Sequence, residues 1–518
     1  MSRDRTTTRA AVASPHHTAS AAGRDVLAAG GNAMDAALAV NAMLAVVYPH
    51  MCGIGGDLFL LYHEARTGEV HCLNGTGPAP RAATRGAFAE RGLDAVPVRG
   101  ALSVTVPGTV AAWEVAAERF GTRALGDLLG PAVDAAANGV GIGDRLAGWA
   151  ADARDDLRTD PTLARRLLDA AGAPLPPGAT LRQPELAESL RRIARHGARD
   201  FYAGELGDAL ARAIGEAGGL LAAADLRAYA PRWVTPIGVP HAGLDIITTP
   251  PNSQGITALL MLDHLAAAHP ELPAGAGFVH AFVAAKRAAF AVRDRYVSDP
   301  RFMPVSAEDL LRDPALRDVA APVAAPPAWG DTVYVCTADA DGNACSLIQS
   351  LYYGFGSAFV AGDTGVLLHN RAHYFSLDEH HPNRLEPGKH TLHTLMACIA
   401  LEDGRPRLVF GAMGADGQPQ MNVQVLHRLL TGDHPGDAVA APRILHGRFL
   451  LEDDVGVLQV EADLDPDTLA TLHAGDGRVE VLPARDERMG HAHAIAIGPD
   501  GAVTAGADPR SDGSAETL

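Results

Sequence analysis

The chain has 518 residues and a formal net charge of −18, and 47% of its residues are hydrophobic against 20% that are charged. This is an ordinary soluble composition, and a chain of this length can bury a large core without disulfides or metals. The acidic balance argues against polyanions, so we expect no nucleic acid partner. No apolar run reaches the ~18–20 residues that a spanning helix needs, so we expect no membrane partner.

The cysteines also limit the class of protein. There are five of them, an odd number, and none are spaced as C-x-x-C: Cys52, Cys72, Cys336, Cys345 and Cys398. This pattern favours buried free thiols in a reducing compartment over a disulfide framework or a zinc site. The first 17 residues contain no apolar run of signal-peptide length. We therefore predict a cytoplasmic location.

Helical patterns dominate the first 300 residues. Residues 20–47 predict two helices separated by Gly30-Gly31-Asn32, and the second, from Ala33 to Val47, is apolar almost all round, as in a buried helix. A glycine cluster at 53–57 precedes the strand-like LFLLYH. Because a phosphate loop would follow a strand and open a helix, we interpret this cluster as a tight turn for close packing. A long amphipathic helix is predicted over AFVAAKRAAFAVRDRY, before Asp299-Pro300.

The second part of the chain is rich in strand patterns. Residues 320–330 (AAPVAAPPAWG) have the composition of an extended linker. DTVYVCTADADGNACSLIQS follows, with two apolar runs around Asp341-Gly342-Asn343, and predicts a β-hairpin. Further strands are predicted in GVLLH (365–369), RLVFGAM (407–413), VGVLQV (455–460), RVEVL (478–482) and AHAIAI (492–497). Helices followed by mixed strands and helices predict layered α+β packing around sheets.

Thr332 lies where this linker meets the first strand of the hairpin. A β-branched residue at a strand start is ordinary, but a cut before Thr332 would place an α-amine beside its hydroxyl. The unperturbed pKa of an α-amine is about 7.7–8.0, so one residue could supply both nucleophile and base at neutral pH. With the turn centred on Asp341-Gly342, Thr332 lies opposite residues 350–351. We therefore expect Ser350 beside it, able to hydrogen-bond to it.

Successive blocks of the chain then carry a resemblance. AAGRDVLAAGGNAMDAALAVNAMLAVVYPHMCGIGGDLF is followed by SVTVPGTVAAWEVAAERFGT, TTPPNSQGITALLML, AAKRAAFAVRDRYVSDPRF, GDTVYVCTADADGNACSLIQS, FGSAFVAGDTGVLLHNR, PGKHTLHTL, GAMGADGQPQ and ADPRSDG. In this order they resemble the gamma-glutamyltransferase (glutathione hydrolase) family of N-terminal nucleophile hydrolases, over nearly the whole chain. The stretches IQS-x-Y, FGS, HTL and MG-x-DGQPQ are most similar to the oxamate amidohydrolases and to glutathione-hydrolase-like proteins of that family.

The resemblance implies a four-layer αββα sandwich and a proenzyme that cuts itself between Asp331 and Thr332. The fragments 1–331 and 332–518 would stay associated as the large and small subunits of one domain. Thr332 would attack an amide and form an acyl-enzyme, which water or an amine then resolves. No cofactor and no metal are implied.

The resemblance also assigns roles around Thr332. Ser350 matches the family's second hydroxyl near the nucleophile. Gly414 and Ala415 occupy its paired-glycine loop, whose backbone N–H groups form the oxyanion hole. Ala415 keeps its N–H, but an alanine is strained there if the position needs a positive φ.

The departures from the family concern the substrate. Where the glutamyl enzymes grip an α-carboxylate with R-E-x-A-P, this chain has TGPAP at 76–80, and it has Tyr352 in place of an asparagine. Their paired serines correspond to His393-Thr394. The block that holds an acid in those enzymes reads NRAHY at 370–374, which introduces Arg371. Since arginine pairs with carboxylates, we predict a small-molecule substrate with an anionic acyl group. Arg371, Tyr352, His393 and Thr394 would line its pocket.

Other functions stay open at this point. The chain could be a true γ-glutamyl or glutathione hydrolase, or a hydrolase of secondary metabolism that removes an oxalyl group by breaking a carbon–carbon bond. It could also be a non-catalytic homologue that never matures and serves as a binding protein, since Ala415 and the pocket are altered. A metal hydrolase using His390, His393, His491 and His493 is disfavoured, because 22 histidines make such pairs common and no H-E-x-x-H occurs.

Some other charged residues have simpler interpretations. Lys286, Arg287 and Arg293 on the long helix are interpreted as surface or ion-pair residues. Asp508 and Arg510 in ADPRSDG are interpreted as a structural pair.

Overall fold

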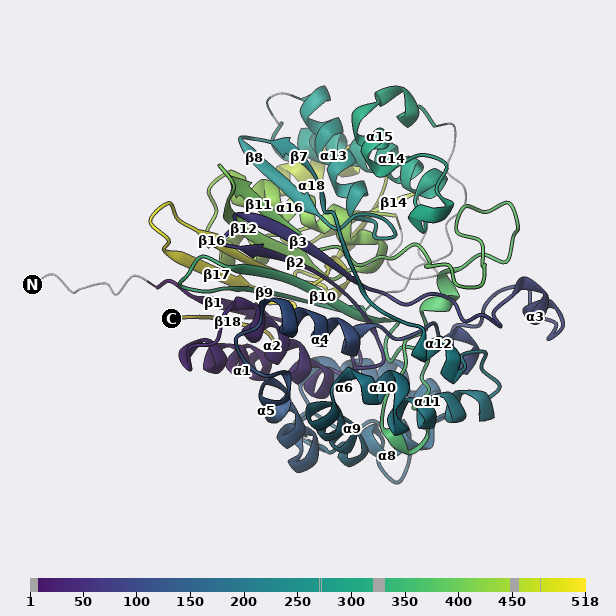
Figure 1. The fold of residues 1–518 in the computed structure, drawn as a ribbon. Helices are drawn as coiled ribbons and strands as arrows, with labels where there is room; N and C mark the ends of the chain where they lie inside the picture. Colours follow the sequence, from purple (N-terminus) through teal and green to yellow (C-terminus); the bar gives the residue numbers. More distant parts are fainter. Residues whose placement is uncertain (1–7, 270, 272, 320–330, 448–455, 476) are drawn as a thin grey trace, which may run out of the picture.

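The computed structural model describes residues 8–269, 271, 273–319, 331–447, 456–475 and 477–518. The predicted linker at 320–330 lies outside the described residues. Two large sheets form the centre of the molecule, with helices covering the outer face of each (Figure 1). This is the predicted αββα arrangement. None of the described helices is long and apolar enough to cross a bilayer.

The first sheet has seven strands and contains the predicted hairpin at its centre. Its order is β18 (Ser514–Thr517), β1 (Ala11–Ser14), β9 (Asp331–Ala338), β10 (Ala344–Tyr352), β2 (Asp57–Glu64), β3 (Glu69–Gly75) and β6 (Arg232–Val234). Segments from both ends of the chain, β1 and β18, pair antiparallel at one edge. The strand that begins at Asp331 therefore lies between β1 and its own hairpin partner.

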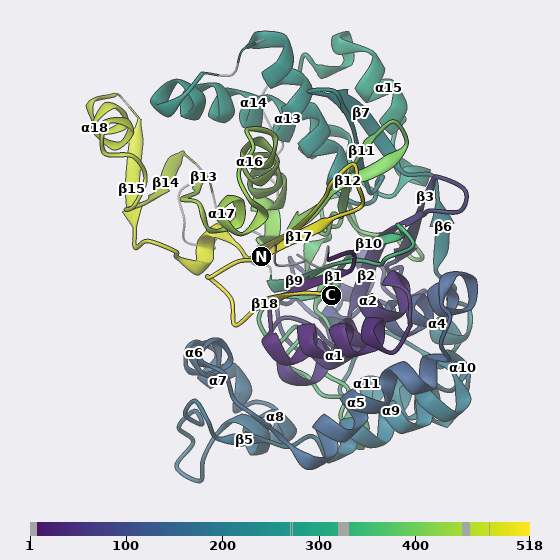
Figure 2. The same ribbon diagram turned by 90° about the vertical axis from the view of Figure 1, so that its left-hand side faces the viewer.

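The second sheet has six strands and supplies the opposite wall of the site. Its order is β17 (Val503–Ala507), β16 (Ala492–Ile497), β12 (Arg405–Ala412), β11 (Cys398–Glu402), β8 (Leu244–Thr248) and β7 (Ile237–His241). A smaller sheet, β13 (Ile444–His446), β14 (Val457–Glu461) and β15 (Arg478–Leu482), lies to one side with α18 (Pro466–Ala474) (Figure 2). A two-stranded pair joins β4 (Val140–Gly141) to β5 (Thr180–Leu181).

One helical layer covers the first sheet. It contains α1 (His17–Ala28), α2 (Ala33–Val47), α4 (Thr109–Phe120), α5 (Leu125–Asn138), α6 (Asp144–Asp152), α7 (Arg154–Leu157), α8 (Pro161–Leu167), α9 (Pro184–His196), α10 (Ala198–Ala203), α11 (Glu205–Glu216) and α12 (Ala223–Arg227). All residues of α2 are buried. A capping box between Asn32 and Asp35 explains why the helix begins where predicted, since each side chain satisfies a backbone N–H that the first turn leaves free.

The other helical layer covers the second sheet and contains α13 (Gly255–Ala268), α14 (Gly275–Tyr296), α15 (Ala307–Arg312), α16 (Gln418–Leu430) and α17 (Pro435–Ala440). The short α3 (Arg85–Ala89) lies away from both layers. A separate apolar cluster fills the space between the two sheets, and Tyr334 and Cys336 of β9 belong to it. Val333 and Val335 of the same strand pack instead with α2 and its neighbours. Alternation along β9 therefore points Thr332 towards the second sheet.

Most predicted strands are present, with one exception. The segment 365–369 was predicted as a strand, but it forms only isolated bridges, Val360 with Leu367 and Gly55 with Leu368. That prediction is wrong, because these apolar side chains are buried by packing against neighbouring loops without a continuous ladder. The glycine cluster acts as the predicted close-packing turn. A Cβ on Gly56 would lie 2.4 Å from the carbonyl oxygen of Ser350.

Candidate active site

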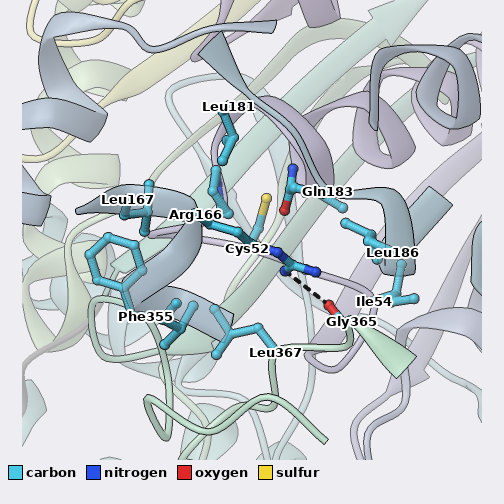
Figure 3. A pocket seen from close by; sticks show the side chains of 14 residues that line it. Cys52, Ile54, Arg166, Leu167, Leu181, Gln183, Leu186, Phe355, Gly365 and Leu367 are labelled. Atoms are coloured by element: carbon cyan, nitrogen blue, oxygen red, sulfur yellow. Dashed lines mark hydrogen bonds between the residues drawn. The ribbon is translucent and has the colours of Figure 1, made fainter. Parts of the chain in front are cut away.

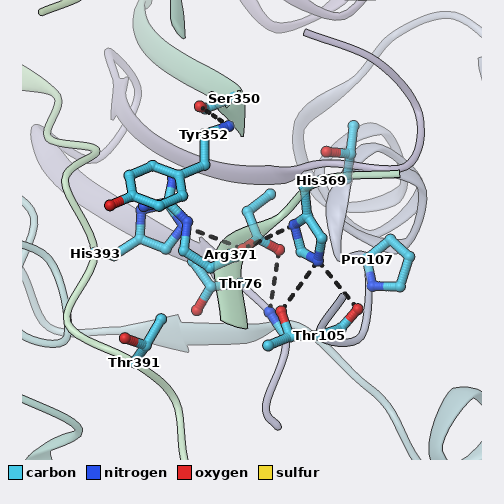
Figure 4. Close-up of polar contacts among 12 residues, drawn as sticks. Thr76, Thr105, Pro107, Ser350, Tyr352, His369, Arg371, Thr391 and His393 are labelled. Carbon is cyan, nitrogen blue, oxygen red and sulfur yellow. Dashed lines mark hydrogen bonds and ion pairs between the residues drawn. The ribbon is translucent and has the colours of Figure 1, made fainter. Parts of the chain in front are cut away.

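The hairpin places Ser350 beside Thr332, as predicted. The ladder runs from Ala338 opposite Ala344 to Val333 opposite Gln349, and then shifts so that Asp331 lies opposite Tyr352. This bulge sets both Ser350 and Leu351 against Thr332, as a bulge does when two residues oppose one. The Ser350 hydroxyl accepts a hydrogen bond from the Tyr352 amide at 2.7 Å (Figure 4). The Thr332 hydroxyl is buried and has no hydrogen-bond partner among the described residues.

Contacts across the two sheets bring the loop after β12 to the same place. Tyr334 lies so close to Gly411 of β12 that a Cβ there would meet its ring at 2.3 Å. Thr332 is two positions before Tyr334 on the same face of β9, which is about 7 Å along the strand. It therefore lies level with the residues that follow β12, among them Gly414 and Ala415.

Contacts of β11 show which end of β12 lies beside Thr332 and Ser350. The amide of Cys398, at the start of β11, donates to the Ser346 hydroxyl at 3.2 Å. Four residues along β10, Ser350 pairs with Asp57, and the Asp57 carboxylate lies 3.1 Å from Nε2 of His393. The segment before β11 thus runs towards the Ser350 end of the hairpin. Since β12 is antiparallel to β11, its end arrives there too.

The Gly414–Ala415 loop, predicted to form the oxyanion hole, has two backbone amides without an acceptor within the described ranges. Neither amide donates to another residue in the part of the chain that the structure describes. Gly414 has φ 142°, and a Cβ there would lie 2.2 Å from the sulfur of Met421, so only glycine fits. Ala415 has φ 49°. A left-handed alanine carries a strain of roughly 1–2 kcal/mol, so this loop is held in its conformation by contacts elsewhere.

Arg371 lies at the same end of the sandwich and is almost completely buried. Its Nη1 donates to the Thr394 hydroxyl at 3.3 Å, while Nε and Nη2 have no hydrogen-bond partner among the described residues. Burial lowers the pKa of Arg371, while Tyr352 and Asp57 raise it, and the guanidinium stays charged. The structure thus holds a buried cation with two donors free for a ligand.

Tyr352 packs against Arg371. The Arg371 guanidinium carbon lies 4.1 Å from the centre of the Tyr352 ring, a cation–π contact. Tyr352 has φ 82°, a conformation imposed by the bulge beside Ser350. Its hydroxyl is buried without a hydrogen-bond partner among the described residues. Figure 4 shows Tyr352, Arg371 and His393 gathered at one point.

His393 is a neutral ring that the protein itself holds at both nitrogens. Burial, and then the neighbouring Arg371, lower its pKa to about 3, so the ring is neutral. Its Nε2 donates to Asp57, and its Nδ1 accepts from the Leu395 amide at 3.2 Å. Both nitrogens are used inside the protein, and the predicted contact of His393 with substrate stays a prediction. Thr394 lies beside Arg371, from which its hydroxyl accepts a hydrogen bond, and its contact with substrate stays a prediction.

Asp57 is a site residue that sequence reasoning missed. It is fully buried, and burial would raise its pKa, but His369 and His393 together bring the pKa well below its usual range. His369 Nδ1 lies 3.4 Å from Asp57, while its Nε2 contacts the Thr105 hydroxyl at 3.0 Å (Figure 4). An acid directly after a glycine cluster was the available signal. The ionised Asp57 supplies a negative charge that supports the nearby Arg371.

The segment that replaces the glutamyl enzymes' arginine block is held by polar side chains and by Asp57, whose carboxylate accepts a hydrogen bond from the Gly77 amide at 3.2 Å. Thr76 donates to Asn74 at 2.7 Å and contacts His390 Nδ1 at 3.1 Å. Both of these Thr76 contacts join uncharged groups. His390 and His393 also face different partners, and the described residues include no group of three or more His, Cys, Asp or Glu arranged to hold a metal.

A small cavity lies on the helical side of the Gly53 turn (Figure 3). Its volume is about 20 Å³, which is room for one water. Cys52 and Leu367 line it, and Arg166 closes it by a hydrogen bond to the Gly365 carbonyl. It is too small to take an acyl group. All five cysteines are buried and free.

Arg293, Asp508 and Arg510 form ion pairs, as interpreted from the sequence, whereas Arg287 is exposed and Lys286 lies 4.4 Å from the centre of the Phe290 ring. Arg293 is buried and pairs with Asp294 at 2.8 Å and Asp416 at 3.2 Å. Arg510 pairs with Glu461 and with Asp508. These pairs are more deeply buried than the sequence indicated.

Comparison with known proteins decides the family. A family model described as gamma-glutamyltranspeptidase matches residues 19–518. The chain belongs to the gamma-glutamyltranspeptidase family. The glutathione hydrolase-like YwrD proenzyme of Bacillus subtilis is 39% identical, over 98% of this chain and 98% of that protein. The oxamate amidohydrolase proenzyme of Klebsiella pneumoniae is 36% identical, over 99% of each.

The cephalosporin acylase of Bacillus halodurans has a crystal structure that superposes with a TM-score of 0.89 at 34% identity, covering 100% of this chain and 97% of that one. The predicted family and fold are therefore confirmed. As a member of the gamma-glutamyltranspeptidase family, the chain is an N-terminal nucleophile hydrolase of the amide-cleaving type. The named relatives act on different acyl compounds, so family membership alone leaves the substrate open.

Proposed function

We propose that this gamma-glutamyltranspeptidase family member is a self-cleaving amide hydrolase in which Thr332 attacks small amides whose acyl group carries a carboxylate. One observation carries the choice of substrate. The buried guanidinium of Arg371 contacts no carboxylate among the described residues, and two of its nitrogens lack a hydrogen-bond partner. Burying such a charge costs several kcal/mol, and a substrate carboxylate bound by charge-assisted hydrogen bonds would offset that cost.

The proposed reaction begins with the cut between Asp331 and Thr332. The new α-amine of Thr332 accepts the proton of its own hydroxyl, whose oxygen then attacks the substrate carbonyl. The Gly414 and Ala415 amides bind the resulting oxyanion. The intermediate expels the leaving amine, which takes the proton from the α-amine, and Thr332 keeps the acyl group as an ester. Water, deprotonated by the same α-amine, then releases the carboxylic acid.

The position of Arg371 favours a short acyl group. Thr394 contacts Arg371 through its hydroxyl and Gln254 through its carbonyl, at 3.3 Å and 2.7 Å. Gln254 in turn contacts the Ala415 carbonyl at 2.9 Å. Only Thr394 and the side-chain amide of Gln254 therefore lie between the Arg371 guanidinium and the Gly414–Ala415 loop in this series of contacts. This supports acyl groups of a few carbons with a terminal carboxylate, a class to which oxamate belongs.

The test is a panel of amides that differ in one charge. Oxamate, succinamate and glutaryl p-nitroanilide are compared with γ-glutamyl p-nitroanilide, which differs from the glutaryl compound by an added ammonium group. We expect kcat/KM for glutaryl p-nitroanilide to exceed that for the γ-glutamyl compound by at least about tenfold, since a cation beside Arg371 is repelled. Thr332→Ala serves as the inactive control.

The opposite ranking would overturn the proposed substrate class. Strong γ-glutamyl turnover without turnover of any of the three anionic amides would mean that Arg371 does not select the acyl group. If the Thr332→Ala variant still turned over these amides, Thr332 would not be the nucleophile.

A further inference from the structure

Gln254 links two parts of the site that are far apart in the sequence. It lies directly before α13 and is 1% exposed. Its side-chain nitrogen donates two hydrogen bonds, to the Thr394 carbonyl at 2.7 Å and to the Ala415 carbonyl at 2.9 Å. Thr394 is the residue that contacts Arg371, and Ala415 is the strained residue of the oxyanion loop. A single amide group therefore joins the acyl pocket to the oxyanion hole.

Arg293 holds Gln254 in this orientation. Its Nη1 donates to the side-chain oxygen of Gln254 at 2.9 Å, which assigns the nitrogen of Gln254 to the two carbonyls. Arg293 is also paired with Asp416, the residue after Ala415, at 3.2 Å. Asp416 accepts a further hydrogen bond from the Tyr374 hydroxyl at 2.8 Å. Each side chain in this series of hydrogen bonds has a defined partner, so the Gln254 side chain cannot rotate away without breaking a buried hydrogen bond.

The loop needs such a support because its backbone is strained. On one side, the Gly417 amide donates to the Gly414 carbonyl at 2.7 Å. On the other side, Gln254 holds the Ala415 carbonyl. With both carbonyls held, the two peptide units that flank the Cα atom of Ala415 have one orientation, and the first of them carries the Ala415 amide. Without Gln254, Ala415 would relax from φ 49° towards the negative values that alanine prefers.

We propose that Gln254 is a positioning residue for the oxyanion hole, and that it keeps Ala415 in its left-handed conformation while fixing the adjacent wall at Thr394. This inference rests on the proposed roles of Thr332 and of the Gly414–Ala415 loop. It does not depend on which acyl group Arg371 selects.

The experiment uses phenylboronic acid, which mimics the tetrahedral intermediate when its boron binds the Thr332 oxygen. The mature enzyme is titrated and followed by ¹¹B NMR, in which tetrahedral boron has a distinct shift. We expect Gln254→Met to weaken formation of the tetrahedral adduct by at least about tenfold. It should also lower kcat on the best panel amide by about 10²-fold, the effect of a misplacement of about 1 Å, with a much smaller change in KM.

Gln424→Met is the matched control. Gln424 is also buried, and its side-chain nitrogen donates to two backbone carbonyls, those of Gln420 at 3.1 Å and Ile444 at 2.9 Å, but on α16 away from the loop. It should bind phenylboronic acid as the parent enzyme does, even if its unfolding midpoint falls by a similar amount. Where Gln254→Met does not mature, Gln254→Glu keeps the acceptor for Arg293 and removes the same two donor contacts.

Ala415→Gly separates positioning from general destabilisation. Glycine is not strained at φ 49°, so the loop should depend less on Gln254. We expect the adduct-weakening effect of Gln254→Met to be about fivefold smaller in the Ala415→Gly background. Equal effects in both backgrounds, or an effect of Gln424→Met equal to that of Gln254→Met, would overturn the proposal. If the parent enzyme forms no tetrahedral adduct, the assignment of Thr332 fails, and this inference fails with it.

Discussion

In the proposed function, Arg371 binds the substrate carboxylate, but burying its charge lowers the free energy of unfolding. These two effects can be measured separately. Replacing an unpaired buried charge with an apolar side chain of similar size removes its desolvation penalty. We therefore predict that Arg371→Met raises the free energy of unfolding by about 1–3 kcal/mol. The same change should lower kcat/KM for the anionic amides by about 10–10²-fold, because it removes charge-assisted hydrogen bonds. Urea unfolding and steady-state kinetics measure the two effects.

Thr394→Val is a useful comparison for this prediction, since it removes the acceptor of the Arg371 Nη1 bond and leaves the charge in place. It should destabilise the fold rather than stabilise it. If Arg371→Met is destabilising and leaves the kinetics unaltered, the guanidinium has a structural partner and no substrate role.

Some residues of the candidate site could be predicted from the sequence and others could not. The proximity of Ser350 to Thr332 was predictable, because the register of a hairpin follows from its turn and its two apolar runs. The roles of Thr332 and Arg371 were inferred from the family resemblance and stay predictions. Asp57 and Gln254 were not predictable, because their roles depend on partners more than a hundred residues away, His393 and Ala415. The internal contacts of His393, to Asp57 and to the Leu395 amide, could not be predicted for the same reason, and its contact with substrate stays a prediction.

At the scale of the elements, the turn before β2 controls how closely β10 can approach. A Cβ on Gly56 would meet the Ser350 carbonyl oxygen at 2.4 Å and the Gln349 side chain at 2.9 Å. We predict that Gly56→Ala destabilises the protein by about 1–3 kcal/mol, as overpacking does. Because Ser350 would be displaced, self-cleavage should also slow. Thermal unfolding and a time course on a denaturing gel measure these effects.

Gly148→Ala is the matched control for Gly56→Ala, since it lies within α6 and a Cβ there meets nothing within 4 Å. It should be neutral or slightly stabilising, by about 0.4–1 kcal/mol. Normal cleavage and an unaltered melting temperature in Gly56→Ala would mean that the turn does not set the position of Ser350.

The hairpin shows what local patterns determine. Its two apolar runs around Asp341-Gly342 predicted the register correctly up to the bulge at Thr332. The segment 365–369 has an equally apolar pattern but forms no ladder, since its backbone meets other loops at single positions. Local sequence patterns also do not predict which strands share a sheet. For example, β8 joins β11 across about 150 residues of chain.

At the scale of the whole molecule, buried histidines make stability depend on pH. Burial lowers the pKa to about 4 for His16, His390 and His493, and to about 3 for His393, His446 and His491. The unfolded chain, with values near 6.5, therefore binds more protons below that pH than the folded one does. Stability is complete above about pH 6.5 and falls as the pH decreases, by up to ~1.4 kcal/mol per unit for each histidine.

Urea midpoints at pH 7.5, 6.0 and 5.0 measure this dependence. The midpoint should fall steadily with pH. His491→Leu, which removes one buried ring whose nitrogens have no partner among the described residues, should make the fall less steep. A midpoint that is constant or rises between pH 7.5 and 5.0 would contradict the assignment of these histidines as neutral in the folded state.

The central claim is that Thr332 becomes the first residue of a second chain and carries the acyl group. Mass spectrometry of the purified protein, alone and after brief incubation with glutaryl p-nitroanilide and acid quenching, tests it most directly. The account predicts two fragments in place of the 53.8 kDa chain, one of them beginning at Thr332 and gaining the mass of one acyl group on that residue. An uncut chain, a new N-terminus at another residue, or an acyl group elsewhere would contradict it.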